Sequence, residues 1–177
     1  MKVKEILTRV AKRLELDEEV KLLDICGINH NVDNLMRLLN LGARDLVGAH
    51  GVKIVKTANM HTSQQNGKLP LACLGDDWIR VVSVTQSGEF TNYEIDEEYI
   101  KFQAAGMHEV TSEYFPMWYY LDDELEPELE VYATALEYFV LAFATAQSGP
   151  FGINYPDANE GAKDFYMMYL AETARLA

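Results

Sequence analysis

The densest group of chemically active side chains is an acidic run within residues 122–130. It consists of Asp122, Asp123, Glu124, Glu126, Glu128 and Glu130. Divalent cations such as Mg²⁺ prefer several carboxylate oxygens, so one interpretation is a metal site that serves a hydrolase. The other is a solvated surface at the start of a helix, where carboxylates complement the helix dipole. The run has no EF-hand pattern and no glycine to turn a binding loop, which favours the solvated surface.

Other residue patterns that carry catalysis do not occur in the sequence. There is no GxGxxG, P-loop, GxSxG or HExxH motif. Cys26 and Cys73 form no CxxC pair and are interpreted as small buried residues of a reducing compartment. No two histidines stand four positions apart; they are His30, His50, His61 and His108. We therefore expect no catalytic, metal-binding or cofactor-binding residue and no enzymatic activity.

An aromatic run in residues 114–120 is the second prominent feature. Its members are Tyr114, Phe115, Trp118, Tyr119 and Tyr120. Such side chains can stack on bases, but stacking platforms for single strands lie in positively charged grooves. The neighbours of this run are instead acidic: Glu109, Glu113, Asp122 and Asp123. Core packing or a protein interface, where Tyr and Trp are enriched, is therefore favoured.

Charge is distributed unevenly along the 177 residues, which carry 15 basic and 28 acidic side chains and a net charge of −13. The acidic balance excludes a protein that grips nucleic acid or an anionic membrane. Residues 1–80 hold 12 basic and 10 acidic residues, whereas residues 81–177 hold 3 and 18. All 19 aromatic residues lie at or after Trp78. A front part without aromatic residues would be marginally stable alone, so we expect one domain, 1–177, with two faces.

The signals for targeting point to the cytoplasm. The first ten residues contain no apolar run of signal-peptide length. Residues 129–146 form the most apolar stretch, but Glu130 and Glu137 would each cost about 3 kcal/mol at the middle of a bilayer. This stretch therefore predicts a buried core helix, and we expect no membrane contact.

Hydrophobic periodicity predicts four helices and a β insertion. Apolar residues recur at helical spacing in 2–14 and 32–46, and Pro127 and Asp157 mark the starts of two more helices. The fold class we expect is mainly α with a small β insertion, that is, a four-helix core with one antiparallel β-sheet between helices two and three. The expected parts are N-terminal helices in 1–51, an extended and partly mobile arm in 52–68, a β insertion in 69–126 and two C-terminal helices in 127–177.

This order of parts, together with several local sequences, resembles a known family. The local sequences are Leu69 and Pro70, then Asp76, Asp77, Trp78 and Ile79 before the predicted hairpin, Pro127 and Glu128 at the third helix, Ala135, Tyr138 and Ala142 along it, and 149–156 before the last helix. The layout resembles the head-to-tail adaptor proteins of short-tailed phages, the connector or tail tubular protein A family. The resemblance spans most of the chain.

The resemblance implies a structural protein of the virion neck. About twelve copies would form a ring beneath the portal protein, attach the tail or nozzle proteins and continue the channel through which genomic DNA passes without specific binding. Helices would form the ring body, and the sheet and arm would contact neighbours. The sequence ends at Ala177 just after the last predicted helix, so we expect the arm, in place of a C-terminal tail, to contact the portal.

Two sets of candidate residues follow. The interface candidates are Lys53, Lys56, Met60, His61, Trp118, Tyr119, Phe151 and Tyr155, and the acidic residues expected to face the channel are Glu124, Glu126 and Glu128. Channel carboxylates would repel phosphate and let DNA slide. Lys53, Lys56 and Lys68 of the less acidic front half are expected to face the acidic half of a neighbour. The alternatives are another structural virion or packaging protein, or a metal-dependent hydrolase that uses residues 122–130.

Overall fold

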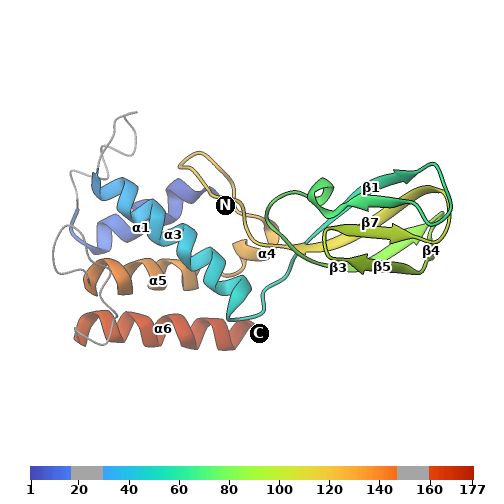
Figure 1. Cartoon of the computed structure of the whole chain (residues 1–177). Coiled ribbons are helices and arrows are strands. Elements are labelled where there is room, and N and C mark those ends of the chain that lie inside the picture. The colour runs from blue at the N-terminus through green and yellow to red at the C-terminus, as the bar shows by residue number, and fades with distance from the viewer. Residues whose placement is uncertain (17–29, 147–159) are drawn as a thin grey trace. The chain divides into compact units, whose positions relative to one another are not determined.

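The computed structural model describes residues 1–16, 30–146 and 160–177, which form two compact units. Unit 1 comprises residues 1–52 and 116–177, and unit 2 comprises residues 53–115. Each unit has its own secondary structure, helical in unit 1 and β-rich in unit 2 (Figure 1). Phe151 and Tyr155, two of the predicted interface residues, lie outside the described residues.

Unit 1 is built from helices that pack around one apolar core helix. Its helices are α1 (Val3–Arg13), α3 (His30–Gly48), α4 (Pro127–Glu130), α5 (Ala133–Ala146) and α6 (Glu160–Leu176). The central helix is α5, which packs against α1, α3 and α6 and buries residues on nearly every side. Because α5 is buried on nearly every side, residues 129–146 are apolar enough to resemble a membrane-spanning helix. No helix in the described ranges combines the length and apolarity that a membrane crossing requires.

One charged pair lies at the contact of α1 with α5. The Arg9 Nε lies 2.6 Å from Oε1 of Glu137, whose side chain is buried. Burial raises the pKa of Glu137, and the nearby Arg9 and Arg13 oppose that shift. Glu137, which argues against a membrane helix, is therefore a core residue with a cationic partner.

Close approach of α3 to α5 requires a glycine. A Cβ atom placed on Gly42 would lie 2.8 Å from Cδ1 of Phe139 and 3.3 Å from Cδ2 of Leu136. Glycine costs about 1 kcal/mol relative to alanine within a helix, so the tight packing of the Phe139 ring offsets a real loss of helix propensity.

Unit 2 contains two antiparallel sheets. The four-stranded sheet has the order β1-β7-β3-β4 and the three-stranded sheet the order β2-β6-β5. The strands are β1 (Ile54–Thr62), β2 (Lys68–Pro70), β3 (Trp78–Gln86), β4 (Glu89–Phe90), β5 (Tyr93–Asp96), β6 (Tyr99–Phe102) and β7 (Gly106–Tyr114), with a 3-10 turn at Leu71–Leu74. Strand β7 pairs with β1 on one side and β3 on the other, in registers such as Met60 with His108 and Val84 with Val110.

A small apolar core holds unit 2 together. The buried residues are Met60, Leu71, Leu74, Val84, Ile100, Phe102 and Val110, contributed by both sheets and the 3-10 turn. The ring of His108, fully buried, stacks on Phe102 with centroids 4.2 Å apart, and its Nε2 lies 3.0 Å from the carbonyl oxygen of Ala104. Tyr93 packs against this core, and its hydroxyl donates to the carbonyl oxygen of Val81 at 3.5 Å.

The fold class expected from the sequence is therefore wrong. Helices α1, α3, α5 and α6 lie where periodicity predicts them, but α4 is a fifth helix, and the β part is two sheets of seven strands within the described residues. Strands β1 and β7 are among those that were missed, because their buried faces are not uniformly apolar. The buried positions of β1 include Thr62, and those of β7 include His108 and Ser112. Polar residues at core positions hide the alternation that identifies a strand.

We expect Gly42→Ala to destabilise unit 1. Overpacking typically costs about 1–3 kcal/mol, more than the helix propensity that alanine gains, so a net loss of about 1 kcal/mol follows. Chemical denaturation followed by far-UV circular dichroism measures the loss. A second change, Phe139→Leu, makes room for the methyl group, and the double variant should therefore lose less than the sum of the two single variants. Additive losses would contradict the close contact.

Candidate functional site

Residues 116–126, here called the strap, run along unit 1 without belonging to either sheet. The amide of Asn40 on α3 fixes the strap at Tyr119: Nδ2 donates to the Tyr119 carbonyl oxygen at 3.1 Å, and Oδ1 accepts from the Tyr119 N–H at 2.7 Å. Asn40 is buried, and its Nδ2 also donates to the Met36 carbonyl oxygen at 2.9 Å. One side chain thereby satisfies both backbone groups of Tyr119.

The strap is tied a second time at the start of α1. The first N–H groups of a helix have no partner within it. Here the N–H of Val3 donates to the carbonyl oxygen of Asp123 at 3.0 Å, and that of Lys4 to the carbonyl oxygen of Leu121 at 3.1 Å. The strap therefore caps α1, and neither element has its full set of hydrogen bonds without the other.

The tied backbone presents large apolar side chains to solvent. Tyr119 is 1% exposed, whereas Met117, Trp118 and Tyr120 are 59%, 49% and 70% exposed. The N–H of Tyr120 donates to Oδ2 of Asp123 at 2.7 Å, which fixes the turn that follows. Rigidly held Trp and Tyr side chains that remain exposed are typical of the anchor residues of protein interfaces.

The acidic run separates into residues with different environments. Asp122 and Glu124 are exposed, Glu128 is half-buried, and the side chains of these three make no hydrogen bond or ion pair with a described residue. Both carboxylate oxygens of Glu126 are buried, so this residue cannot offer its charge to a channel in the folded unit. No group of three or more potential metal ligands occurs in the parts of the chain that the structure describes.

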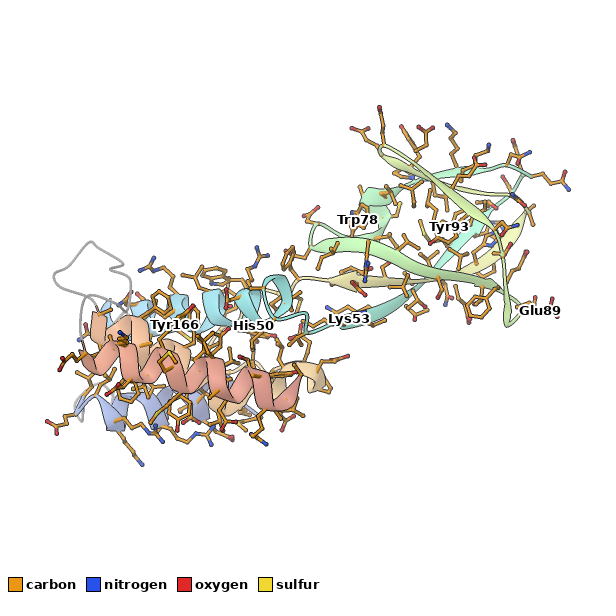
Figure 2. The ribbon with its side chains drawn as sticks, turned by 90° about the horizontal axis from the view of Figure 1, so that it is seen from below. His50, Lys53, Trp78, Glu89, Tyr93 and Tyr166 are labelled. Carbon is orange, nitrogen blue, oxygen red and sulfur yellow. The ribbon has the colours of Figure 1, made fainter. Side chains whose placement is uncertain are left out.

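The predicted interface residues around β1 are spread over different surroundings in unit 2. Lys53 precedes β1 (Figure 2), and its Nζ lies 3.5 Å from Oε1 of Glu113. Lys56 holds its ammonium 5.4 Å from the ring centroid of Tyr114. His61 is exposed, but Met60 is a core residue, as Tyr119 is in unit 1. Burial removes Met60 and Tyr119 from any surface of the folded units, while Trp118 stays accessible.

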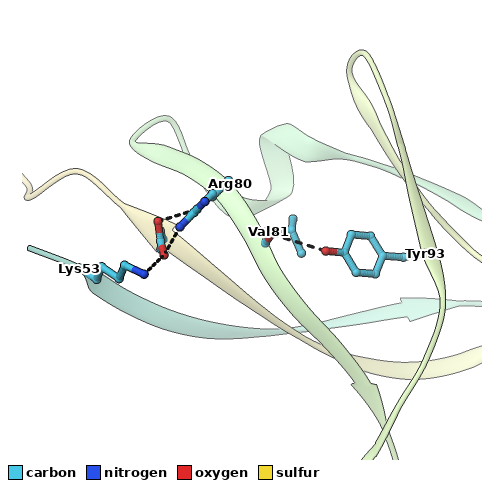
Figure 3. Close-up of polar contacts among 5 residues, drawn as sticks. Lys53, Arg80, Val81 and Tyr93 are labelled. Carbon is cyan, nitrogen blue, oxygen red and sulfur yellow. Dashed lines mark hydrogen bonds and ion pairs between the residues drawn. The ribbon is translucent and has the colours of Figure 1, made fainter. Parts of the chain in front are cut away.

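Glu113 organises the cations at this end of β1. Arg80 binds it with two parallel hydrogen bonds, Nε to Oε2 at 2.7 Å and Nη2 to Oε1 at 2.9 Å, and Lys53 approaches from the other side (Figure 3). The Arg80 hydrogen bonds hold the pKa of Glu113 below its usual value, against the effect of partial burial. Glu113 therefore holds two cations within unit 2, and its single negative charge is shared between Arg80 and Lys53.

A second polar cluster, which sequence reasoning missed, joins α3 to α6. The hydroxyl of Tyr169 donates to Oδ2 of Asp45 at 2.5 Å, and Nε2 of His50 lies 3.4 Å from the same oxygen. Burial and the neighbouring carboxylate raise the pKa of Tyr169 far above its usual value, so its hydroxyl stays protonated and acts as a donor. The cluster is a structural link. Asp45 and Tyr169 are 124 positions apart, and no local signal connects them.

Asn40 and Tyr120 are candidate functional residues of the strap region that the sequence-based list of interface candidates did not include. The signal for Asn40 was a polar residue on the apolar face of α3, since Met36 and Ala43, which share that face, are buried. A buried amide whose local partner takes only one of its hydrogen bonds indicates a tertiary hydrogen bond.

No protein-family model matches the chain, and no curated protein matches its sequence.

We expect Asn40→Ala to release the strap. Two backbone groups of Tyr119 lose their partners, and the expected loss in free energy of unfolding is about 2–4 kcal/mol. Chemical denaturation measures the loss, and faster hydrogen exchange of the Tyr119 amide localises it. The matched control is Asn34→Ala on the same helix, where the side-chain oxygen accepts from Arg37 at the surface and less than about 0.5 kcal/mol should be lost. Equal losses would contradict the anchor.

Glu113→Gln should change the pH dependence of stability. Because the folded pKa of Glu113 is lowered, its charge stabilises the folded state above the usual pKa of 4.5, and that contribution is lost as the pH falls through the folded value. The variant should therefore be less stable than the wild type at pH 7, and the difference should shrink in acid. Urea denaturation at several pH values tests this, with Glu109→Gln on the same strand as control. A difference independent of pH would contradict it.

Proposed function

We propose that the chain is a structural head-to-tail adaptor of a phage neck, which assembles as a ring of about twelve copies beneath the portal and provides the surface for tail attachment. The observation that carries the proposal is the strap, with its backbone fixed at Asn40 and its Met117, Trp118 and Tyr120 side chains exposed. Side chains held in this way serve assembly better than catalysis.

The local features behind the family resemblance have structural roles that support the proposal. Asp77 precedes β3, and its carbonyl oxygen accepts from the N–H of Phe115 at 2.8 Å, which fixes the end of β7 beside the start of β3. Pro127 opens α4, where its missing N–H costs nothing. The proposed location is the virion neck, and the proposed partners are further copies, the portal protein and tail or nozzle proteins.

The distribution of charge supports a channel that DNA passes without binding. No Lys or Arg occurs from residue 102 to residue 162, and Glu128 presents a carboxylate with no side-chain partner among the described residues. In a ring, this group would repel the phosphate backbone, whereas cations would hold it through many counterion-releasing contacts. We assign this role to Glu128, and not to the buried carboxylate of Glu126 or to Glu124, which belongs to the strap.

The test is assembly with the portal protein encoded in the same genome. Purified chain mixed with portal should form a complex whose mass, by light scattering, corresponds to about twelve added copies per portal ring. A monomer in isolation is compatible with the proposal, because the portal provides the template for the ring. Failure to bind the portal, and tail proteins added with it, would contradict it.

Charge reversal in the assembled complex tests the channel. Glu128→Lys should leave binding to the portal intact and slow the passage of DNA in an ejection assay, because one ammonium group per copy would then contact phosphate. Glu97→Lys, on the exposed turn before β6, is the matched control and should not affect passage. Normal passage through the Glu128 variant would remove the channel role but not the adaptor role.

A further inference from the structure

We propose that the strap of one copy docks on the exposed cationic face of α1 of a second copy. This contact rests on the proposed ring, for which it names the surface between neighbouring copies. Its basis is the exposed strap, the pairing of the cations on unit 2, α6 and α1, and the position of the two surfaces on unit 1.

The strap has the properties of a preformed binding element. Met117, Trp118 and Tyr120 are exposed on a backbone that Asn40 already fixes, so little further ordering is needed on binding. Asp122 and Glu124 beside them are exposed, and their side chains make no hydrogen bond or ion pair with a described residue. The complementary surface must therefore cover aromatic rings and supply positive charge.

The cations of unit 2 are already engaged. Lys53 and Arg80 bind Glu113, and Lys56 lies over the Tyr114 ring. The two remaining cations form ion pairs at 2.7 and 3.2 Å, Lys68 with Asp96 and Lys101 with Glu94. The expectation that Lys53, Lys56 and Lys68 face a neighbour's acidic half therefore has weak support, because each already has a partner within its own unit.

Helix α6 does not provide the cationic surface for the strap either. Arg175 is paired with Glu172 at 2.8 Å, and exposed Lys163 is followed directly by exposed Asp164. The exposed positions of α6 are thus close to neutral. Helix α1 is different, because its exposed positions after Lys2 are Glu5, Arg9, Lys12 and Arg13.

The C-terminal half of α1 matches what the strap requires. Lys12 is exposed and has no side-chain partner among the described residues. The Arg9 side chain is 47% exposed even though it binds Glu137. Arg13 lies 5.4 Å from the ring centroid of Tyr138, so it already makes a cation–π contact within its own copy. Aliphatic stems of Lys and Arg can cover Trp118 and Tyr120 while their charged ends meet Asp122 and Glu124.

The positions of the two surfaces suit a contact between copies. Each strap holds α1 of its own copy at Val3 and Lys4, whereas Lys12 and Arg13 lie about 13 Å further along that helix. A copy therefore offers its strap and the far end of α1 as separate, complementary surfaces. Such a heterologous contact, repeated from copy to copy, closes into a ring when the rotation allows.

Charge exchange between two full-length variants is the decisive test. The first variant carries Asp122→Lys and Glu124→Lys, and the second carries Lys12→Glu and Arg13→Glu. Sedimentation velocity up to about 1 mM should show self-association for the wild type and at least about thirtyfold weaker association for each variant alone. An equal mixture should associate again, because each strap then meets an α1 of opposite charge. Misfolded chains cannot produce that recovery.

Two controls complete the experiment. Trp118→Ala should weaken association of the wild type at least about thirtyfold, whereas Phe90→Ala, at an 84% exposed side chain of unit 2, should not change it. Glu97→Lys with Glu98→Lys, which alters charge to the same extent on unit 2, should likewise have no effect. A wild type that stays monomeric over the whole concentration range, or a mixture no better than its components, overturns the contact.

The results separate this contact from the proposed function. If Trp118→Ala assembles on the portal as the wild type does, the contact is wrong and the adaptor function stands. If copies associate through the strap but bind no portal, the adaptor function is wrong and the contact stands.

Discussion

The hydrogen bonds between the Asn40 side chain and the Tyr119 backbone are the constraint on which the organisation of unit 1 depends. An Asn amide can donate twice and accept at its oxygen, and here Met36 and Tyr119 use that capacity inside the core. Because the strap is fixed there, its Leu121 and Asp123 carbonyl oxygens reach the first N–H groups of α1. One buried amide thus connects α3, the strap and the start of α1, and it leaves Trp118 and Tyr120 outside.

Charge is arranged differently in the two units. In unit 2, each described Lys or Arg already contacts a carboxylate or an aromatic ring, as where Glu113 receives both Arg80 and Lys53. In unit 1, the exposed strap carboxylates Asp122 and Glu124 form no side-chain ion pair within the described residues, and Lys12 of α1 has no side-chain partner there, although Arg9 binds Glu137. Exposed ion pairs add little to stability, so the local pairs of unit 2 matter mainly because they occupy its cations. Cations that remain available for a partner, such as Lys12, therefore lie on unit 1.

Helix positions were predictable from the sequence, and most of the β structure was not. Apolar spacing located α1, α3, α5 and α6, because each helix buries apolar residues in a core, α5 on nearly every side and the others on one side. Strand β1 was interpreted as part of an arm because polar residues such as Asn59 and Thr62 interrupt its apolar pattern, and the aromatic run in 114–120 was placed within the β insertion 69–126. After Tyr114 this run lies outside the sheets, and the Tyr119 backbone pairs with Asn40 and not with a neighbouring strand. In both cases tertiary partners, which no local pattern encodes, decided the outcome.

In the candidate site too, tertiary partners that no local pattern encodes decided which residues could be identified from the sequence. Trp118 was found because residue type alone suggests an interface, whereas Tyr119, next to it and of similar type, is buried. Its backbone is held by Asn40 across 79 positions of sequence, and this bond determines which ring turns inward. Type and composition thus identify the segment that carries an interaction surface, but a distant hydrogen bond selects the residues exposed on it. The outward side chains of the strap are therefore a consequence of how α3 is built, and changes on α3 will alter the surface that the strap presents.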